Sequence, residues 1–187
     1  MRIVSVNASL AREVPWRGGT VRTGIFKEPV AGYHRVGSRG IEGDEQADLR
    51  VHGAPTKAVY AYPSEHYAFW SGELPGTDLP WGAFGENLTT EGLLEGAVRV
   101  GDRYRIGTAV LEVTKPRFPC YKLGIKFGRE DILPRFLHSG RSGFYFAVAR
   151  EGEVAAGDPI EVLARAAEGP TIEGLVRERI RKDEAGE

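Results

Sequence analysis

The stretch Asp102-Arg-Tyr-Arg-Ile106, Gly107-Thr108, Ala109-Val-Leu-Glu-Val-Thr114 decides the fold class of this chain. Apolar and polar residues alternate on both sides of Gly107-Thr108, which is typical of two antiparallel strands joined by a short turn. A second run, Gly143-Phe-Tyr-Phe-Ala-Val-Ala149, is apolar and aromatic and predicts the strongest strand of the chain. These runs predict a sheet-rich fold.

Working outward from them, the sequence predicts many further short strands and only a few helices. Turn residues dominate from Val14 to Gly24. Strands are expected at 2–7, 25–30, 33–36, 58–62, 86–90, 98–100 and 161–163, helices at 63–70 and 129–138, and a long loop at 37–57. Short strands repeating every ~8–12 residues favour a mostly β protein with a closed or nearly closed β-barrel and a few short helices.

Two segments are expected along the chain. Residues 1–165 contain all the predicted strands and form one barrel domain. In residues 166–187, Ile172, Leu175, Val176 and Ile180 share one helical face, which predicts a short amphipathic helix followed by a charged tail.

The composition fits a globular cytoplasmic protein. The 187 residues are 41% hydrophobic and 27% charged, with a formal net charge of −1, so no overall electrostatic attraction to nucleic acid or membrane is expected. We find no signal peptide and no apolar stretch of membrane-spanning length. The single cysteine excludes an intramolecular disulfide and favours a reducing compartment.

That cysteine, Cys120, lies in the segment Thr114-Lys-Pro-Arg-Phe-Pro-Cys-Tyr-Lys-Leu123. Nearby cations favour the thiolate, which is the form that acts as a nucleophile or a metal ligand. The two prolines restrict the backbone and would present the thiol in a defined geometry. On this pattern alone, an inert buried cysteine and a functional thiol remain open.

Other polar residues cluster in three glycine-containing segments. The loop from Gly43 to Lys57 brings together Asp48, Arg50, His52 and Lys57, which can move protons or bind an anion, although a solvated surface loop is the alternative. Asn87 lies in a glycine-rich strand entry, and Arg141 and Ser142 precede the strongest strand. Turns alone would also explain these glycines.

Common nucleotide and metal motifs are absent from the sequence. It has no GxxxxGK[ST] loop, no GxGxxG after the first strand and no HExxH. One cysteine and four scattered histidines do not form a zinc site of the usual type.

Taken together, five segments resemble the MOSC domain, named for the C-terminal domain of molybdenum cofactor sulfurases, and in particular its stand-alone bacterial YiiM-like branch. They span most of residues 1–163 in the expected order: Gly40–Gly53, Lys57–Pro63, Gly82–Gly92, Leu111–Leu123 and Gly140–Tyr145. The resemblance implies a pyruvate-kinase-like β-barrel, in agreement with the strand pattern.

The resemblance also implies a site. Cys120 would be the protein ligand of the molybdenum in a pterin cofactor, since a soft thiolate suits a metal held by soft dithiolene sulfurs. Asp48 and His52 are expected near the metal as proton-transfer groups. The residues expected to hold the phosphate, pterin or linker of the cofactor are Lys57, Asn87, Thr114, Arg117, Lys122, Arg141 and Ser142. Pyridoxal phosphate is a further association of the family, but the sequence marks no lysine as a Schiff-base former.

The implied activity is the reduction of N-hydroxylated compounds, such as hydroxylaminopurines and amidoximes, with electrons from a separate reductase. A non-catalytic cofactor carrier or sulfur-handling module is the alternative, and a cofactor-free thiol enzyme using Cys120 and His52 is a third hypothesis. A monomer or a homodimer is expected, without nucleic acid or membrane partners. Only the beginning of the C-terminal helical extension common in YiiM-like relatives is recognised, at Pro170–Val176.

Overall fold

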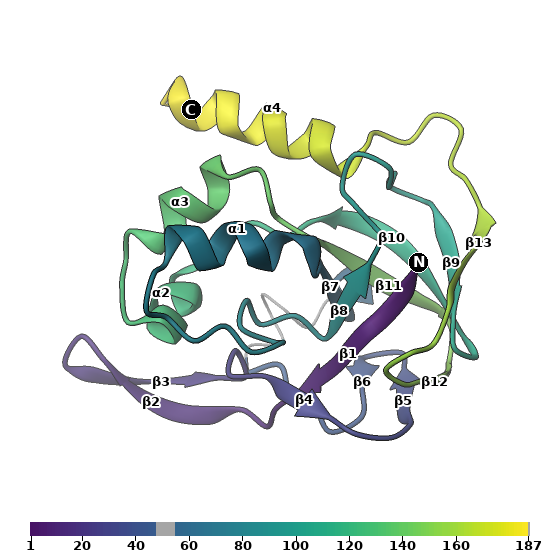
Figure 1. Cartoon of the computed structure of the whole chain (residues 1–187), viewed down its shortest axis with the longest axis horizontal. Coiled ribbons are helices and arrows are strands. Elements are labelled where there is room, and N and C mark those ends of the chain that lie inside the picture. The colour runs from purple at the N-terminus through teal and green to yellow at the C-terminus, as the bar shows by residue number, and fades with distance from the viewer. Residues whose placement is uncertain (48–54, 187) are drawn as a thin grey trace.

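A large mixed sheet forms the centre of the protein. The computed structural model describes residues 1–47 and 55–186. Within them the sheet comprises β1 (Arg2–Ala8), β4 (Glu28–Val30), β7 (Val59–Pro63), β8 (Leu88–Glu91), β9 (Arg103–Ile106), β10 (Ala109–Pro116), β11 (Phe144–Arg150) and β13 (Ile160–Ala164). The spatial order is β13-β9-β10-β11-β7-β8-β1-β4 (Figure 1). The described fold is therefore dominated by strands, as the sequence predicts.

The hairpin predicted around Gly107-Thr108 is confirmed. β9 and β10 pair antiparallel, with Ile106 opposite Ala109, and β10 continues into an antiparallel ladder with β11. β7 and β8 are the exception, because they pair in parallel. The chain between them forms a helix and a glycine-rich loop, which supply the crossover that parallel neighbours need.

β1, the strand next to the β4 edge, approaches the opposite edge strand β13 without a continuous ladder. The Ile3 amide donates to the Asp158 carbonyl at 2.9 Å, and the Ile160 amide donates to the Met1 carbonyl at 3.0 Å. The contact between β1 and the start of β13 is a single bridge, Arg2 with Pro159. Closure of the sheet into a barrel therefore stays a prediction.

Two small sheets lie beside the main one. One is the hairpin of β2 (Arg12–Trp16) and β3 (Gly19–Thr23), and the other contains β12 (Gly152–Val154), β5 (His34–Gly37) and β6 (Gly40–Ile41). The turn-rich segment from Val14 to Gly24 does contain a tight turn, at Arg17-Gly18, but the two paired strands that this turn joins were not predicted. The strand predicted at 98–100 is also wrong, because only an isolated bridge forms there.

Helices cover one face and one end of the sheet (Figure 1). They are α1 (Glu65–Glu73), α2 (Tyr121–Phe127), α3 (Ile132–His138) and α4 (Ile172–Glu184), and a short 3₁₀ helix, η1, spans Pro55–Lys57. α1, α3 and α4 fall where helices are predicted. α2 was not predicted, because Gly124 and its short length weaken the helical pattern after Cys120.

Two hydrophobic clusters fill the interior. The first joins the main sheet to α4, which contributes Ile172 and Val176. The second lies among α1, α2 and α3 and contains packed aromatic side chains, among which the rings of Trp70 and Phe136 are stacked and those of Trp70 and Phe84 are tilted. The segment that carries Cys120 runs between these clusters, from the end of β10 into α2.

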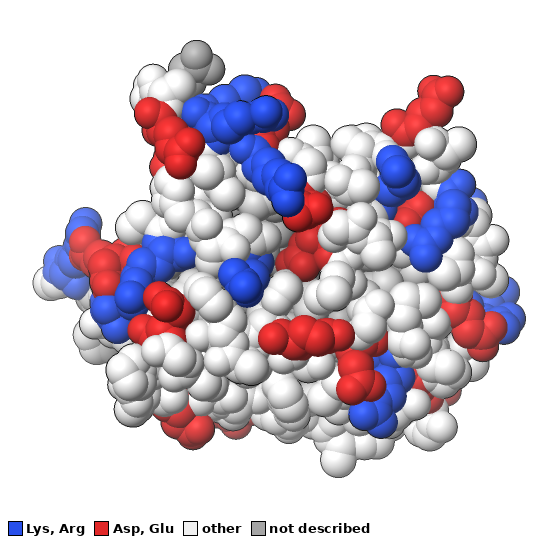
Figure 2. Space-filling model, turned by 45° about the horizontal axis from the view of Figure 1, so that its top comes forward, with Lys and Arg blue, Asp and Glu red and all other residues white. Residues whose placement is uncertain are grey.

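The charged residues on the visible face in Figure 2 are of both signs and interspersed. On α4, ion pairs one helical turn apart join Arg177 to Glu173 and Lys182 to Glu178. Among the described residues, no helix combines the length and apolar character needed to cross a bilayer.

Candidate functional site

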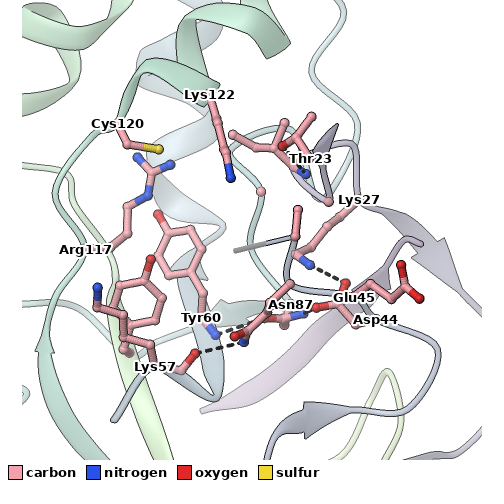
Figure 3. Close-up of a pocket in the computed structure, with 16 residues that line it drawn as sticks. Thr23, Lys27, Asp44, Glu45, Lys57, Tyr60, Asn87, Arg117, Cys120 and Lys122 are labelled. Atoms are coloured by element: carbon pink, nitrogen blue, oxygen red, sulfur yellow. Dashed lines mark hydrogen bonds and ion pairs between the residues drawn. The ribbon is translucent and has the colours of Figure 1, made fainter. Parts of the chain in front are cut away.

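A pocket opens beside Cys120, where the end of β3, the segment after β6, β7 and the loop before β8 meet (Figure 3). Its described lining residues are Thr23, Gly24, Ile25, Lys27, Asp44, Glu45, Gln46, Ala47, Lys57, Tyr60, Gly85, Asn87, Arg117, Cys120, Lys122 and Tyr145. Segments far apart in the sequence therefore supply one cavity, and it contains the only thiol of the chain.

The backbone around Cys120 explains how the thiol is presented. β10 ends at Pro116, and Cys120 is the extended residue that precedes the first turn of α2. The amide of Arg117 donates to the carbonyl of Gly143 at 3.2 Å, which ties the segment to the start of β11. The thiol is partly exposed and lies at the pocket wall.

Arg117 is the most unusual cation of the pocket. Its side chain is buried, and its guanidinium lies 5.5 Å from the ring centre of Tyr60 and 5.1 Å from that of Phe136. Its Nη1 atom is buried without a hydrogen-bond partner, and no carboxylate of the described residues forms an ion pair with it. A buried donor without an acceptor costs about 1–3 kcal/mol, so the arrangement is suited to an anion that enters from outside.

The other cations lie near the same thiol. Lys122, on the first turn of α2, is buried and extends its amine into the pocket (Figure 3). Burial and then repulsion from Lys115 lower the pKa of Lys57, while Cys120 opposes that shift. Burial also lowers the pKa of Arg117, but Tyr60, Tyr145 and Cys120 more than offset it, so the guanidinium stays charged. This end of the pocket thus combines a thiol with three cations.

The opposite end carries a buried ion pair. The Lys27 ammonium contacts the Asp44 carboxylate, and the two side chains are only 8% and 5% exposed. Asp44 also accepts hydrogen bonds from the Ser9 amide at 3.1 Å and from Asn87 Nδ2 at 2.9 Å. Figure 3 shows this group across the cavity from Cys120 and Arg117.

Asn87 lines the pocket but is engaged by the protein. Its Oδ1 accepts from the Tyr60 amide at 3.1 Å, and its Nδ2 donates to Asp44 and, at 3.4 Å, to the Asn7 carbonyl. The side chain therefore joins β1, β7 and the segment after β6. Its position supports the wall of the pocket, and these bonds occupy both polar ends of the amide.

A buried carboxylate supports the loop before β8. Glu86 accepts hydrogen bonds from the amides of Gly82 at 2.9 Å and Phe84 at 3.1 Å, from Thr89 Oγ1 at 2.9 Å and from the Tyr67 hydroxyl. Burial raises the pKa of Glu86, and these donors oppose the rise. They fix the backbone that places Gly85 and Asn87 in the pocket wall.

A glycine permits a close approach on the other wall. A Cβ atom at Gly24 would lie 2.1 Å from the carbonyl oxygen of Glu45. Only glycine therefore lets the end of β3 pack against the segment that carries Asp44. This contact could not be predicted from the local sequence pattern, because the two segments are distant along the chain.

The structure brings together five of the residues predicted for the site and leaves three outside the pocket lining. The pocket is lined by Cys120, Lys57, Asn87, Arg117 and Lys122. It is not lined by Thr114, Arg141 or Ser142. The predicted Asp48 and His52 lie outside the described residues.

The three residues outside the lining have protein partners. Thr114 Oγ1 donates to the Thr56 carbonyl at 2.6 Å, which holds η1 and Lys57 against β10. Arg141 stacks on Phe69, with its guanidinium carbon 3.7 Å from the ring centre. The carbonyl of Ser142 accepts a 2.9 Å hydrogen bond from the Tyr60 hydroxyl. Direct cofactor contacts by these three residues stay predictions.

Sequence reasoning missed Lys27, Tyr60 and Tyr145 as pocket residues. Each sits in or near a predicted strand, where an aromatic or a lysine is ordinary. Burial of the Lys27 amine could not be inferred, because it depends on the distant Asp44. Within residues 1–47 and 55–186, no group of three or more His, Cys, Asp or Glu side chains could hold a metal ion by itself.

Comparison with known proteins agrees with this arrangement of segments. The model of the MOSC domain matches residues 48–161, which include Cys120 and the pocket-lining residues on β7, on β11 and in the loop before β8. The chain belongs to the MOSC domain family. MOSC domains are associated in general with binding of the molybdenum cofactor.

Individual MOSC proteins are similar over most of this chain. YflK of Bacillus subtilis is 41% identical over 171 residues, covering 91% of this chain and 77% of YflK. The crystal structure of YiiM from Geobacillus stearothermophilus superposes with a TM-score of 0.79 at 34% identity and covers 97% of this chain and 84% of YiiM. A Gibberella moniliformis protein named "Reductase" is 38% identical over 151 residues, but the match spans only 27% of that protein.

Proposed function

We propose that this MOSC protein binds a molybdenum cofactor in the Cys120 pocket and reduces N-hydroxylated small molecules, of the hydroxylaminopurine or amidoxime type, with electrons from a separate reductase. The observation that carries the proposal is the buried, unpartnered Nη1 of Arg117 in the same cavity as the only thiol. The closure of the sheet into a MOSC-type barrel and a cytoplasmic location belong to the same proposal.

The residues present fit the cofactor. The thiolate of Cys120 is a soft ligand, which suits a metal already coordinated by dithiolene sulfurs. Arg117, Lys122 and Lys57 offer positive charge to a phosphate, and Arg117 supplies a donor that the fold leaves without an acceptor. When bound, the cofactor would supply the two-electron redox chemistry.

The protein would contribute binding and orientation. Arg117 would orient an anionic group by a fixed, planar donor, and Lys122 and Lys57 would add attraction from two other directions. The rings of Tyr60 and Tyr145, with centroids 5.3 Å apart, form an aromatic wall at this end of the cavity. A substrate would then meet the polar end of the pocket, which carries Lys27 and Asp44.

Metal analysis tests the proposal. Protein produced with molybdate in a host that makes the cofactor should carry about one molybdenum per chain, because the chain offers one thiolate ligand. Cys120→Ala should lose the metal while keeping the fold. Tyr33→Ala changes an exposed side chain outside the pocket lining and should keep it. Full molybdenum in Cys120→Ala would contradict the proposed ligation.

Turnover separates the enzyme from a cofactor carrier or sulfur-handling module, which would use the same pocket. Loaded protein supplied with reduced viologen should convert benzamidoxime to benzamidine over many cycles. Loaded wild-type protein that holds molybdenum but gives no product from amidoximes or hydroxylaminopurines would support the carrier instead.

A further inference from the structure

The buried Lys27–Asp44 pair has features that a purely structural role does not require. Both side chains are more than nine-tenths buried, and burying two charges costs free energy that an apolar pair would not. The pair nevertheless forms part of the wall of an open pocket. The charged groups of Lys27 and Asp44 are therefore available to a molecule bound in the pocket.

The Lys27 ammonium is only partly used by the protein. Asp44 is its hydrogen-bond acceptor among the described residues. An ammonium carries three N–H donors, so others remain for a molecule in the pocket. Asp44, in contrast, is fixed from three sides by Lys27, the Ser9 amide and Asn87 Nδ2. The carboxylate therefore positions the amine.

We propose that Lys27 is the acid that protonates the departing oxygen when an N-hydroxylated compound is reduced in this pocket, with Asp44 as its positioning residue. The inference rests on the proposed function. The overall change is R–NH–OH + 2 e⁻ + 2 H⁺ → R–NH₂ + H₂O, with electrons from the separate reductase. As the N–O bond breaks, the oxygen takes the Lys27 proton and leaves as water. The nitrogen takes its proton from solvent, which then reprotonates Lys27.

The charges around Lys27 suit this role. Burial lowers the pKa of its amine, while Asp44 and Glu86 oppose the shift. Lys126 lies close enough to interact with it, and the other ionisable groups that line the pocket are Glu45, Lys57, Tyr60, Arg117, Cys120, Lys122 and Tyr145. An ammonium with a lowered pKa gives up its proton more readily near neutral pH than a surface lysine does.

Lys27→Arg tests the proton transfer. Arginine keeps the positive charge for Asp44 but does not deprotonate in proteins. We expect the same molybdenum content as wild type and a fall in kcat/KM of roughly 10²–10⁴-fold, the usual contribution of a general acid. The wild-type rate should fall at alkaline pH as Lys27 deprotonates, and the variant should lack this fall. Lys126→Arg, outside the pocket lining, is the matched control and should keep both rate and profile.

A second measurement needs no cofactor. NMR titration of the lysine Nζ signals in the full chain should give Lys27 a pKa below those of exposed lysines such as Lys182, and Asp44→Asn should lower it further by removing the favourable charge. Lys27→Met with Asp44→Asn replaces the ion pair by a neutral pair. This double variant should fold and bind molybdenum but show the low rate of Lys27→Arg.

Three outcomes would overturn the inference. The first is a wild-type rate and pH profile in Lys27→Arg. The second is loss of molybdenum in that variant, which would make Lys27 a binding residue. The third is an unshifted Lys27 pKa. Failure of the proposed function gives other results: Cys120→Ala retains molybdenum, or the wild-type protein shows no turnover. Either result would also exclude Lys27 as the proton donor.

Discussion

At the scale of single residues, the two arginines predicted for the site behave differently. Arg117 is buried in the pocket with Nη1 unpartnered, whereas Arg141 is half-buried, donates to the Ser139 carbonyl and stacks on Phe69. Both are single arginines beside turn residues in the sequence, so local pattern could not separate them. Their surroundings come from residues distant along the chain.

We therefore expect Arg117→Met to stabilise the cofactor-free protein and to abolish anion binding. Methionine keeps the packing of the side-chain stem but removes a buried donor that lacks an acceptor. After the loss of the cation–π contacts is included, the substitution should raise the free energy of unfolding by about 1 kcal/mol. Urea denaturation measures the stability, and isothermal titration with inorganic phosphate measures the binding.

Arg141→Met is the matched control for that substitution. It should leave phosphate binding and molybdenum content unchanged, because its guanidinium lies outside the pocket lining. Equal loss of binding in both variants would show that the pocket geometry does not distinguish these arginines. A marked loss of stability in Arg117→Met would show that the buried guanidinium is a structural group.

At the scale of elements, a glycine decides how β11 joins β7. A Cβ atom at Gly143 would lie 2.4 Å from the Ala61 carbonyl oxygen and within 3 Å of the rings of Tyr60 and Tyr62. Glu95 accepts a hydrogen bond from the Gly143 amide at 2.8 Å and also contacts His66 of α1. The start of β11, the pocket wall and α1 therefore meet at one backbone position.

Gly143→Ala should cost clearly more stability than Gly140→Ala. Both glycines have positive φ, 60° and 71°, but a Cβ at Gly140 meets nothing within 4 Å. The Gly140 substitution should cost about 1 kcal/mol from backbone strain alone, and the Gly143 substitution about 2 kcal/mol or more, because overpacking adds to that strain. Thermal denaturation measures both, and equal losses would show that the sheet yields easily at Gly143.

At the scale of the whole molecule, α4 is part of the domain core. Ile172 and Val176 are fully buried in the cluster formed by the main sheet, and the Ile172 amide donates to the Val98 carbonyl at 2.9 Å. Asp102 accepts from the Ala166 amide at 2.8 Å and from Arg165, which fixes the segment leading to α4. The C-terminal helix and the strands therefore share one core.

Ile172→Ala should destabilise the whole protein by roughly 2–5 kcal/mol, as expected for a large-to-small change in a core. Because the core is shared, the unfolding transition reported by tryptophan fluorescence, to which Trp70 and Trp81 of the other cluster contribute, should shift together with the far-ultraviolet circular dichroism signal. Ile180→Ala, at a partly buried position on the same helix face, should shift the unfolding transition less. An unmoved fluorescence transition would show that α4 unfolds separately.

Local sequence patterns predict the sheet-rich class, the β9–β10 hairpin, the main strand β11, most of the helices and the grouping of Cys120 with neighbouring cations. These features depend on alternation, turn residues and charge close along the chain, which are local properties. The β2–β3 hairpin and α2 could not be predicted from the sequence, because proline and glycine residues weaken their local patterns.

Tertiary contacts determine which polar residues share the pocket. It placed Lys27 against Asp44, left Arg117 Nη1 buried without an acceptor, and turned Arg141 away from the pocket onto Phe69. Local pattern does not reveal this, because burial, pairing and desolvation depend on contacts between segments far apart in sequence. A residue's type reveals what chemistry it can perform, but its distant neighbours determine whether that chemistry is available.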